Sequence, residues 1–163
     1  MKEMRRKKQL LSEAETIAVL ERGTNGVLAV IDEAGYPYAV PLSYVYCDGK
    51  LYFHGAKKGH KIDAIRHCEK ASFCVVDKDE IVPEEYTTYF RSVIAFGKVQ
   101  VLEEETEVKA ALMKLAMKYS HVMGKAGCKA VVKGNIASVA LILLEIEHMT
   151  GKASAKLIAA KQE

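Results

Sequence analysis

Basic side chains gather in the stretch LYFHGAKKGHKIDAIR, residues 51–66, where a strand would end and a helix would begin. Lys57, Lys58 and Lys61 surround the first residues of that helix. Backbone amides that are free at a helix start bind phosphate well, and ammonium groups beside them strengthen the binding. The stretch therefore predicts a phosphate site, and an ordinary solvated loop is the alternative.

Two other side chains lie where they could take part in chemistry. His54 ends an apolar run and is followed by small residues, so it either faces a ligand or is an ordinary structural histidine. Arg91 lies within the apolar segment FRSVIAFGK, residues 90–98. If Arg91 is buried, it needs an anion or a carboxylate, because an unpaired buried guanidinium is very unfavourable. If it points outward, it needs no partner.

Pro41 interrupts an otherwise regular strand pattern, YPYAVPLSYVY, at residues 36–46. Proline donates no hydrogen bond to a sheet, so it is found at edges, at bulges or where pairing ends. A strand that opens there leaves the amides of Leu42 and Ser43 free to bind something other than a neighbouring strand. An edge strand without a ligand is the alternative.

Several familiar catalytic and metal sites are absent from the sequence. The segment TGKAS, residues 150–154, lacks the upstream glycine and the Ser or Thr after lysine that a P-loop needs. Neither G-x-S-x-G nor G-x-G-x-x-G occurs, which excludes a nucleophile elbow and a Rossmann fingerprint. The four cysteines and five histidines have no metal-binding spacing, so we expect no metal site. Any chemistry would then have to come from a bound cofactor.

Length and composition indicate a single globular domain. The chain has 163 residues, of which 50% are hydrophobic and 28% are charged, enough for one core without disulfides. The net charge of +3 is small, and no basic stripe with interleaved aromatic residues occurs, so we expect no nucleic-acid partner. The cysteines are scattered, no signal peptide is evident, and the longest apolar run, residues 139–144, is too short to span a bilayer. We therefore expect a cytoplasmic protein without a membrane partner.

Helical segments should position some of these residues. Apolar periodicity predicts helices at about residues 12–22, 59–68 and 103–119. Ser12 and Glu15 form the capping-box pattern of a helix start, and Gly23 suits a left-handed stop at its end. The glycine- and lysine-rich segment 120–134 is interpreted as a mobile loop, with at most one helical turn.

Strands should make up most of the remaining chain. Period-two and apolar segments predict strands at residues 26–31, 36–46, 51–54, 71–77, 88–102 and 136–148. Six strands joined mostly by hairpins, with helices inserted between them, are typical of a closed antiparallel barrel with flanking helices. We therefore expect a mainly β, α+β domain over residues 1–154, followed by a C-terminal tail over residues 155–163.

Four segments in a fixed order carry a family resemblance. They are AVPLSYVY, DGKLYFHGAKKGHKIDAIR, YFRSVIAFGKV and LEIEHMTGKAS, and with the leading MRRK they span about residues 4–154. This order resembles the pyridoxamine 5′-phosphate oxidase-like, FMN-binding split barrels, and among them the nitroimidazole-resistance-protein-like group. The resemblance implies a six-stranded antiparallel split β-barrel that forms a homodimer and binds two FMN molecules in clefts between the protomers.

The resemblance also implies which residues contact FMN. The strand around Pro41 would lie along the isoalloxazine, the end of the next strand and the following helix would hold the ribityl chain and phosphate, and the fifth strand would close the site. His54 would be the catalytic side chain near the reacting face, as proton donor or substrate contact. The implied cofactor-binding residues are Val40, Pro41, Leu42, Ser43, His54, Gly55, Ala56, Lys57, Lys61, Arg91, Ser92 and Val93.

By the same resemblance, the protein would be an FMN-dependent oxidoreductase. It would pass electrons from a reduced carrier to a small acceptor, such as a nitro-aromatic compound. The alternative is a non-catalytic flavin- or haem-binding protein for sensing or storage, and the family also has members that use haem or a deazaflavin. The chain has no tryptophan and lacks the C-terminal signature with which the true oxidase binds pyridoxal phosphate, so vitamin B6 oxidation is not expected.

Overall fold

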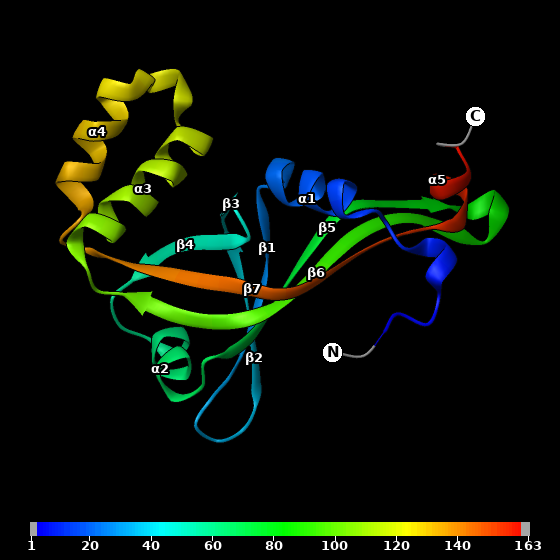
Figure 1. Ribbon diagram of the computed structural model, residues 1–163, viewed down its shortest axis with the longest axis horizontal. Coiled ribbons are helices and arrows are strands. Elements are labelled where there is room, and N and C mark those ends of the chain that lie inside the picture. The colour runs from blue at the N-terminus through cyan, green and yellow to red at the C-terminus, as the bar shows by residue number, and fades with distance from the viewer. Residues whose placement is uncertain (1–2, 161–163) are drawn as a thin grey trace.

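The computed structural model describes residues 3–160 and consists of strands with helices on both sides (Figure 1). The strands are β1 Asn25–Ile31, β2 Pro37–Ser43, β3 Val45–Cys47, β4 Lys50–Ala56, β5 Lys70–Val82, β6 Thr87–Leu102 and β7 Val139–Ala153. The α-helices are α1 Glu13–Arg22, α2 His60–His67, α3 Glu105–Tyr119, α4 Gly124–Asn135 and α5 Ala155–Ala159. Short 3₁₀ turns occupy Lys7–Gln9, Pro83–Glu85 and His121–Met123.

All seven strands join one antiparallel sheet in the order β2-β1-β5-β6-β7-β4-β3. The prediction of a mainly antiparallel sheet with flanking helices is therefore confirmed. The prediction that the barrel is closed is wrong, because β2 and β3 form two unpaired edges of the sheet within residues 3–160. An open seam between the ends is what a split barrel has.

The strand count is seven rather than six because Tyr44 divides the strand predicted at 36–46. Its side chain is fully buried, and its hydroxyl donates a hydrogen bond to the carbonyl of Leu20 on α1 at 2.8 Å. Its backbone N–H donates to the hydroxyl of Tyr119 at 3.0 Å rather than to a neighbouring strand. The period-two pattern of the sequence continues through Tyr44, but hydrogen bonds to α1 and α3 interrupt the strand there and separate β2 from β3.

A helix occupies most of the segment 120–134, where a mobile loop was predicted. This helix, α4, packs Cys128 and Val132 into the protein while its lysines face outward. Gly127 has a packing role, since a Cβ there would lie 3.1 Å from the Cβ of Met123. The loop prediction was wrong because the packing of an apolar stripe outweighs the low helix propensity of glycine.

The start of α1 agrees with the sequence, but its end does not. Ser12 and Glu15 form the predicted capping box, with Glu15 N–H donating to Ser12 Oγ at 3.3 Å. Gly23 follows the helix with a φ of −61°, so the predicted left-handed stop was wrong. Glycine is required there for space instead, because a Cβ would lie 2.4 Å from the hydroxyl oxygen of Tyr44.

Two hydrophobic cores lie on opposite faces of the sheet, and β7 contributes to both. Ile142 and Leu144 belong to the main core, which also contains buried side chains of α1 and α2. Leu141 and Leu143 belong to a second core, here called the helical core, which contains buried side chains of α3 and α4. Because strand side chains alternate between faces, a strand that is covered on both sides is apolar throughout. This explains the run VALILL at residues 139–144.

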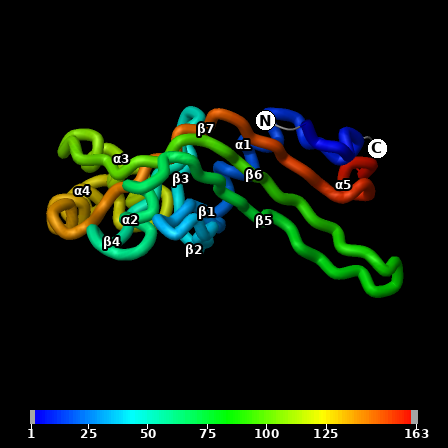
Figure 2. Tube along the Cα trace, turned by 90° about the horizontal axis from the view of Figure 1, so that it is seen from below, coloured from blue at the N-terminus to red at the C-terminus, as the bar shows by residue number. Residues whose placement is uncertain are grey.

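The strands β5 and β6 extend beyond the rest of the sheet as a long two-stranded arm (Figure 2). The short helix α5 lies near this arm, where Lys156 Nζ contacts Glu85 Oε1 at 2.7 Å. The division of the chain at residue 154 stays a prediction, and residues 161–163 of the predicted tail lie outside the described residues. Within residues 3–160, every helix is too short or too polar to cross a membrane.

Candidate functional site

The open seam of the sheet lies between β2 and the end of β4. β2 pairs with β1 alone, so its other edge carries no strand within the described residues. β4 pairs with β7 along its whole length, but with β3 only over Lys50–Tyr52. Residues 53–56 therefore also have an edge without a strand. Backbone donors and acceptors along two such edges can bind a ligand.

Pro41 lies on this edge strand, as its sequence context predicted. It is exposed and stands opposite Val27 of β1. Val40 and Leu42 turn their half-buried side chains toward the main core, whereas Pro41 and Ser43 are exposed. A ligand at this edge would therefore meet the side chains of Pro41 and Ser43, but only the backbone of Val40 and Leu42.

The end of β4 places its residues on two different faces. Gly55 faces α2, and His54 is exposed on the opposite face. A Cβ at Gly55 would lie 2.8 Å from Lys61 Cε and 3.2 Å from Lys61 Nζ. Glycine at this position thus leaves room for the half-buried Lys61 side chain to pack against the backbone of β4. The predicted neighbours Gly55 and Lys61 are brought together by this contact.

The start of α2 has the features of an anion site. Gly59 precedes the helix with a φ of 126°, a conformation that favours glycine, and no side chain caps the first turn. The exposed residues Ala56, Lys57 and Lys58 lead into this turn from β4. The predicted phosphate site therefore has a helix start without a side-chain cap and exposed lysines in the preceding turn, and binding of an anion there stays a prediction.

His60 has a structural explanation, although it lies beside these lysines. Its ring stacks on Tyr38 of β2, with ring centroids 4.2 Å apart and an interplanar angle of 12°. Its Nε2 lies 3.3 Å from Asp32 Oδ2 in the turn between β1 and β2. These contacts connect the start of α2 to the edge strand. Within residues 3–160, no cluster of histidine, cysteine and carboxylate side chains could hold a metal ion.

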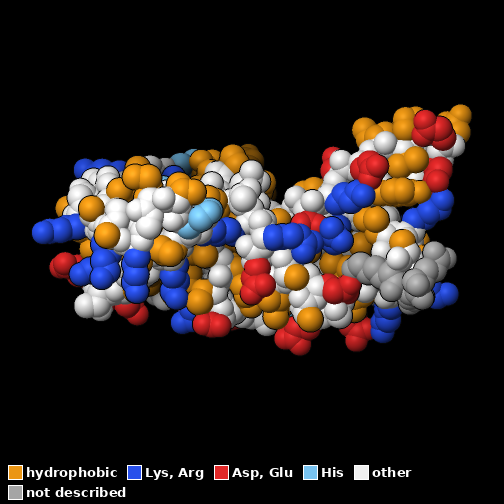
Figure 3. Space-filling view, turned by 90° about the horizontal axis from the view of Figure 1, so that it is seen from above, with side chains coloured by type: hydrophobic (Ala, Val, Ile, Leu, Met, Phe, Trp, Pro, Cys, Tyr) orange, Lys and Arg blue, Asp and Glu red, His pale blue; other side chains and the backbone are white. Residues whose placement is uncertain are grey.

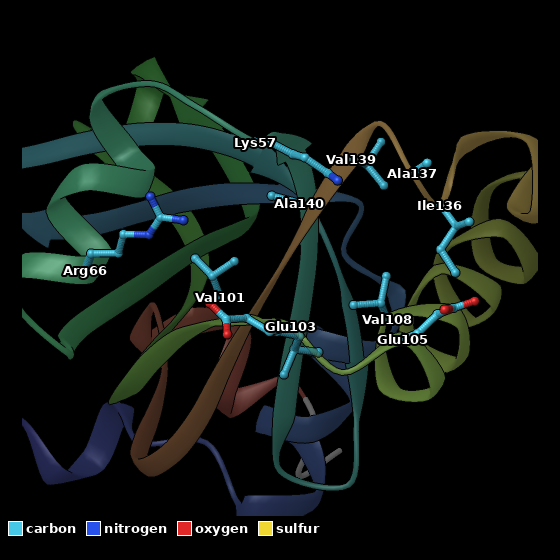
Figure 4. A pocket seen from close by; sticks show the side chains of 11 residues that line it. Lys57, Arg66, Val101, Glu103, Glu105, Val108, Ile136, Ala137, Val139 and Ala140 are labelled. Atoms are coloured by element: carbon cyan, nitrogen blue, oxygen red, sulfur yellow. The ribbon is translucent and has the colours of Figure 1, made fainter.

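Lys57 lines a charged cavity of about 520 Å³ (Figure 4). Arg66 of α2 brings a second cation to this cavity, and Glu103 and Glu105 bring two carboxylates. No role for Arg66 was predicted from the sequence, although it stands in the last turn of α2, whose first turn contains Lys61. Arg66 and Lys57 line the same cavity because of how α2 packs against the sheet, which periodicity alone does not show.

His54 and Ser43 line a different cavity, of about 440 Å³, between β4 and the helices α3 and α4. A hydrogen-bonded group at Tyr119 holds α3 against the sheet here. The Tyr119 hydroxyl lies 2.6 Å from the carbonyl oxygen of Tyr44 and 2.5 Å from that of Thr24. Burial raises the pKa of Tyr119, which keeps its hydroxyl protonated. These contacts of Tyr119 were not predicted, because they join α3 to segments far from it in the chain.

The predicted cofactor residues fall into three groups: those on β2, those from β4 to the start of α2, and Arg91, Ser92 and Val93 on β6. The residues of the β6 group make contacts with other parts of the protein. Arg91 forms an ion pair with Asp77, which also binds Arg22 with oxygen–nitrogen distances of 2.6 and 2.7 Å. Burial alone would raise the pKa of Asp77, but hydrogen bonds and charge from the two arginines outweigh it and lower that pKa. Ser92 is half-buried and Val93 is fully buried in the main core.

Within one chain, the β6 group does not line the seam. The ring of Phe53 on β4 lies 5.0 Å from the ring of Phe73, which stands opposite Ala95 of β6, so β4 and β6 approach each other through the main core. Val93 is buried in that core, and Arg91 is paired with Asp77. The structure therefore brings residues of β2, β4 and α2 to the seam, whereas Arg91 and Val93 are used in other contacts.

Solved structures of several bacterial proteins share this fold. A conserved hypothetical protein from Mycobacterium tuberculosis is 21% identical, with a TM-score of 0.79 over 95% of this chain and 92% of that chain. A candidate 5-nitroimidazole antibiotic resistance protein from Bacteroides thetaiotaomicron is 19% identical, with a TM-score of 0.72 over 88% and 86%. An FAD- and haem-binding protein from Mycobacterium smegmatis is 18% identical, with a TM-score of 0.73 over 96% and 81%.

Sequence comparison agrees with the fold. No curated protein matches the chain. The sequence profile described as pyridoxamine 5′-phosphate oxidase matches residues 12–153, which include every strand and the first four α-helices. The resemblance that the order of motifs predicted is thereby confirmed, and the chain belongs to the pyridoxamine 5′-phosphate oxidase family.

Proposed function

We propose that this protein binds FMN across the open seam and works as an oxidoreductase that reduces a small acceptor. The observation that carries the proposal is the close packing of the Lys61 side chain on Gly55, beside the start of α2 that no side chain caps. A side chain at position 55 would take the space of Lys61, so the combination of glycine and lysine favours a phosphate site over a solvated loop. The family and the FAD-binding neighbour of the same fold support a flavin as the cofactor.

The residues at the seam suit the parts of FMN. Lys57, Lys61 and the first amides of α2 would bind the phosphate, because cations and a helix start both stabilise an anion. The exposed edge at Pro41 and Ser43 would hold one side of the ring, with backbone groups as hydrogen-bond partners. Bound FMN would supply the electron-transfer chemistry. His54 would donate a proton to the acceptor or position it, since it is exposed on the face of β4 opposite Gly55.

A homodimer would complete the site. An open seam in one protomer would leave a planar, partly apolar ring exposed to water, whereas cofactor sites usually bury most of the ligand surface. This supports two FMN sites between two protomers.

The first experiment is an absorption spectrum of the purified protein before and after FMN addition and dialysis. We expect retained flavin bands, and about tenfold to hundredfold weaker FMN binding in Lys61→Ala, because one charge-assisted contact to phosphate is lost. Lys70→Ala is the matched control, since Lys70 is an exposed lysine on β5. A protein that ignores FMN, or equal FMN affinity in Lys61→Ala and wild type, would contradict the proposed site.

A non-catalytic binding protein is the second candidate function. The fold is shared with a protein that binds both FAD and haem, and His54 is an exposed imidazole that could serve as an axial ligand. Reduction of the bound flavin by a nicotinamide carrier, followed by reoxidation by a nitro-aromatic compound, would support the enzyme. A flavin that stays oxidised, or a Soret band after haem addition, would support the binding protein.

A further inference from the structure

The cavity beside His54 is enclosed mainly by apolar side chains. Leu112, Leu115 and Ala116 line it from α3, and Val131 and Val132 line it from α4. Its volume of about 440 Å³ falls within the range of small-molecule sites, roughly 300–1,000 Å³. No lysine, arginine, aspartate or glutamate lines this cavity within the described chain.

The polar groups of the wall are mostly used by the protein itself. The Tyr119 hydroxyl lies within hydrogen-bonding distance of two backbone carbonyls, and the Cys128 thiol donates to the carbonyl of Ser120 at 3.4 Å. His54 differs, because it is exposed and has no hydrogen bond to another residue between positions 3 and 160. His54 therefore offers the cavity a polar side chain that the described part of the protein does not itself use, among walls that are mainly apolar.

Apolar side chains also remain exposed at the mouth of this cavity. Met123 is 63% exposed and Val131 is 56% exposed, although both lie on its lining. Hydrophobic side chains gather on the end of the molecule that α3 and α4 form, next to a row of basic side chains (Figure 3). Exposed apolar surface around a concave site is typical of ligand binding.

We propose that this cavity binds an uncharged, mainly apolar small molecule about the size of indole, and that Ala116 and Met123 limit its size. A charged molecule would lose its hydration without finding a counter-ion in these walls. The small side chain of Ala116 leaves room between the two helices, and the unbranched Met123 can adapt to the ligand. This inference deepens the proposed function. Only the role of the bound molecule as the electron acceptor rests on that function.

Methionine methyl groups allow a direct test, because three different cavities each contain one. Met123 lines the proposed site, Met113 lines the outer groove between α3 and α4, and Met149 lines a groove beside α1. The full-length protein, labelled at its methionine methyl groups, would be titrated with indole and, separately, with indole-3-carboxylate at pH 8. We expect a saturating shift of the Met123 signal with indole, at least about tenfold weaker binding of the carboxylate, and unchanged Met113 and Met149 signals.

Two matched variants make the test specific. Ala116→Phe fills the cavity and should weaken indole binding at least about tenfold. Ala110→Phe places the same side chain on an exposed position of the same helix, in the outer groove, and should bind indole as the wild type does. Retained indole binding in Ala116→Phe, shifts at Met113 or Met149 instead of Met123, equal binding of the two probes, or no shift at all would each overturn the inference.

The test is independent of the cofactor. Indole is not reduced, so its binding reports the cavity alone. FMN retention is measured separately by absorption. If the protein binds indole but does not retain FMN, the cavity assignment stands and the proposed function is contradicted. If it retains FMN but indole causes no shift at Met123, the proposed function stands and the cavity assignment is contradicted.

Discussion

The two cavities at the end of β4 are similar in volume, about 520 and 440 Å³, but opposite in chemistry. The cavity at Lys57 contains two cations and two carboxylates, whereas the cavity at His54 is walled mainly by hydrocarbon. Consecutive residues of a strand point to opposite faces, so Gly55 meets α2 while His54 lies on the side of α3 and α4. Gly55 and Lys61 line neither cavity, and the cavity at Lys57 is also bounded by Glu105 and Val108 of α3. The end of β4 thus presents the proposed phosphate contact on one face and the apolar cavity on the other.

The two hydrophobic cores extend this difference into the rest of the molecule. Phe53 packs in the main core with α2, and its neighbour Tyr52 packs against the helical core with α3 and α4. Each face of β4 is therefore supported by its own helices. A change on one face should affect one ligand and leave the other unaffected, and the predictions below depend on this separation.

The largest effect is expected from Gly55→Val. The new side chain would take the space of Lys61 Cε and displace the ammonium group from the phosphate site. We expect about hundredfold weaker FMN binding, or ~2.8 kcal/mol, measured by fluorescence titration. Lys61 ends in a flexible chain that can move away, so the melting temperature and the indole shift at Met123 should stay near the wild-type values. Loss of both ligands together would show that the faces are not independent.

Asp77→Asn tests a region that belongs to neither cavity. Its carboxylate binds both Arg22 and Arg91 and is 8% exposed, so the change should lower the free energy of unfolding by about 2 kcal/mol at pH 7. The pKa of Asp77 is lowered in the folded state, so this stability is present above the ordinary carboxyl pKa and is lost as pH falls through the lower folded value. Urea unfolding should therefore show a smaller difference between variant and wild type at pH 3 than at pH 7.

Glu80→Gln is the control for that prediction. Glu80 is an exposed carboxylate of β5 that pairs with Lys78, and exposed pairs contribute little. Its unfolding free energy should stay within about 0.5 kcal/mol of the wild type. An Asp77→Asn protein as stable as Glu80→Gln would mean that the paired arginines do not stabilise the arm. Indole binding should be unchanged in both variants, because neither residue lines the His54 cavity.

The charged face of β4 could be predicted from the sequence, because its residues are close together in the chain. Gly55, Lys57 and Lys61 fall within seven positions, and a strand end followed by a helix start is a local pattern. The same local logic found the capping box and the edge position of Pro41. Roles for Arg66 and for the divided strand at Tyr44 were missed, because each depends on packing between distant segments.

The apolar face could not be predicted for the same physical reason. Its walls come from β2, β4, α3 and α4, and α4 itself was interpreted as a loop. Three glycines between residues 124 and 134 dominated that interpretation. Only the contact of Cys128 and Val132 with the rest of the protein reveals a helix there. A site made by long-range packing leaves no local signal in the chain.

The smallest effect is expected from Gly127→Ala in α4. Alanine gains up to about 1 kcal/mol of helix propensity over glycine, but its Cβ would stand 3.1 Å from the Cβ of Met123. Met123 lies in the exposed turn before α4, so it can shift by a few tenths of an ångström toward the cavity that it lines. We expect a free energy of unfolding raised by about 0.5 kcal/mol and indole binding weakened about twofold, with FMN binding unchanged. Tighter indole binding would instead show that Met123 moves away from the cavity, and weaker FMN binding would show that α4 also affects the charged face.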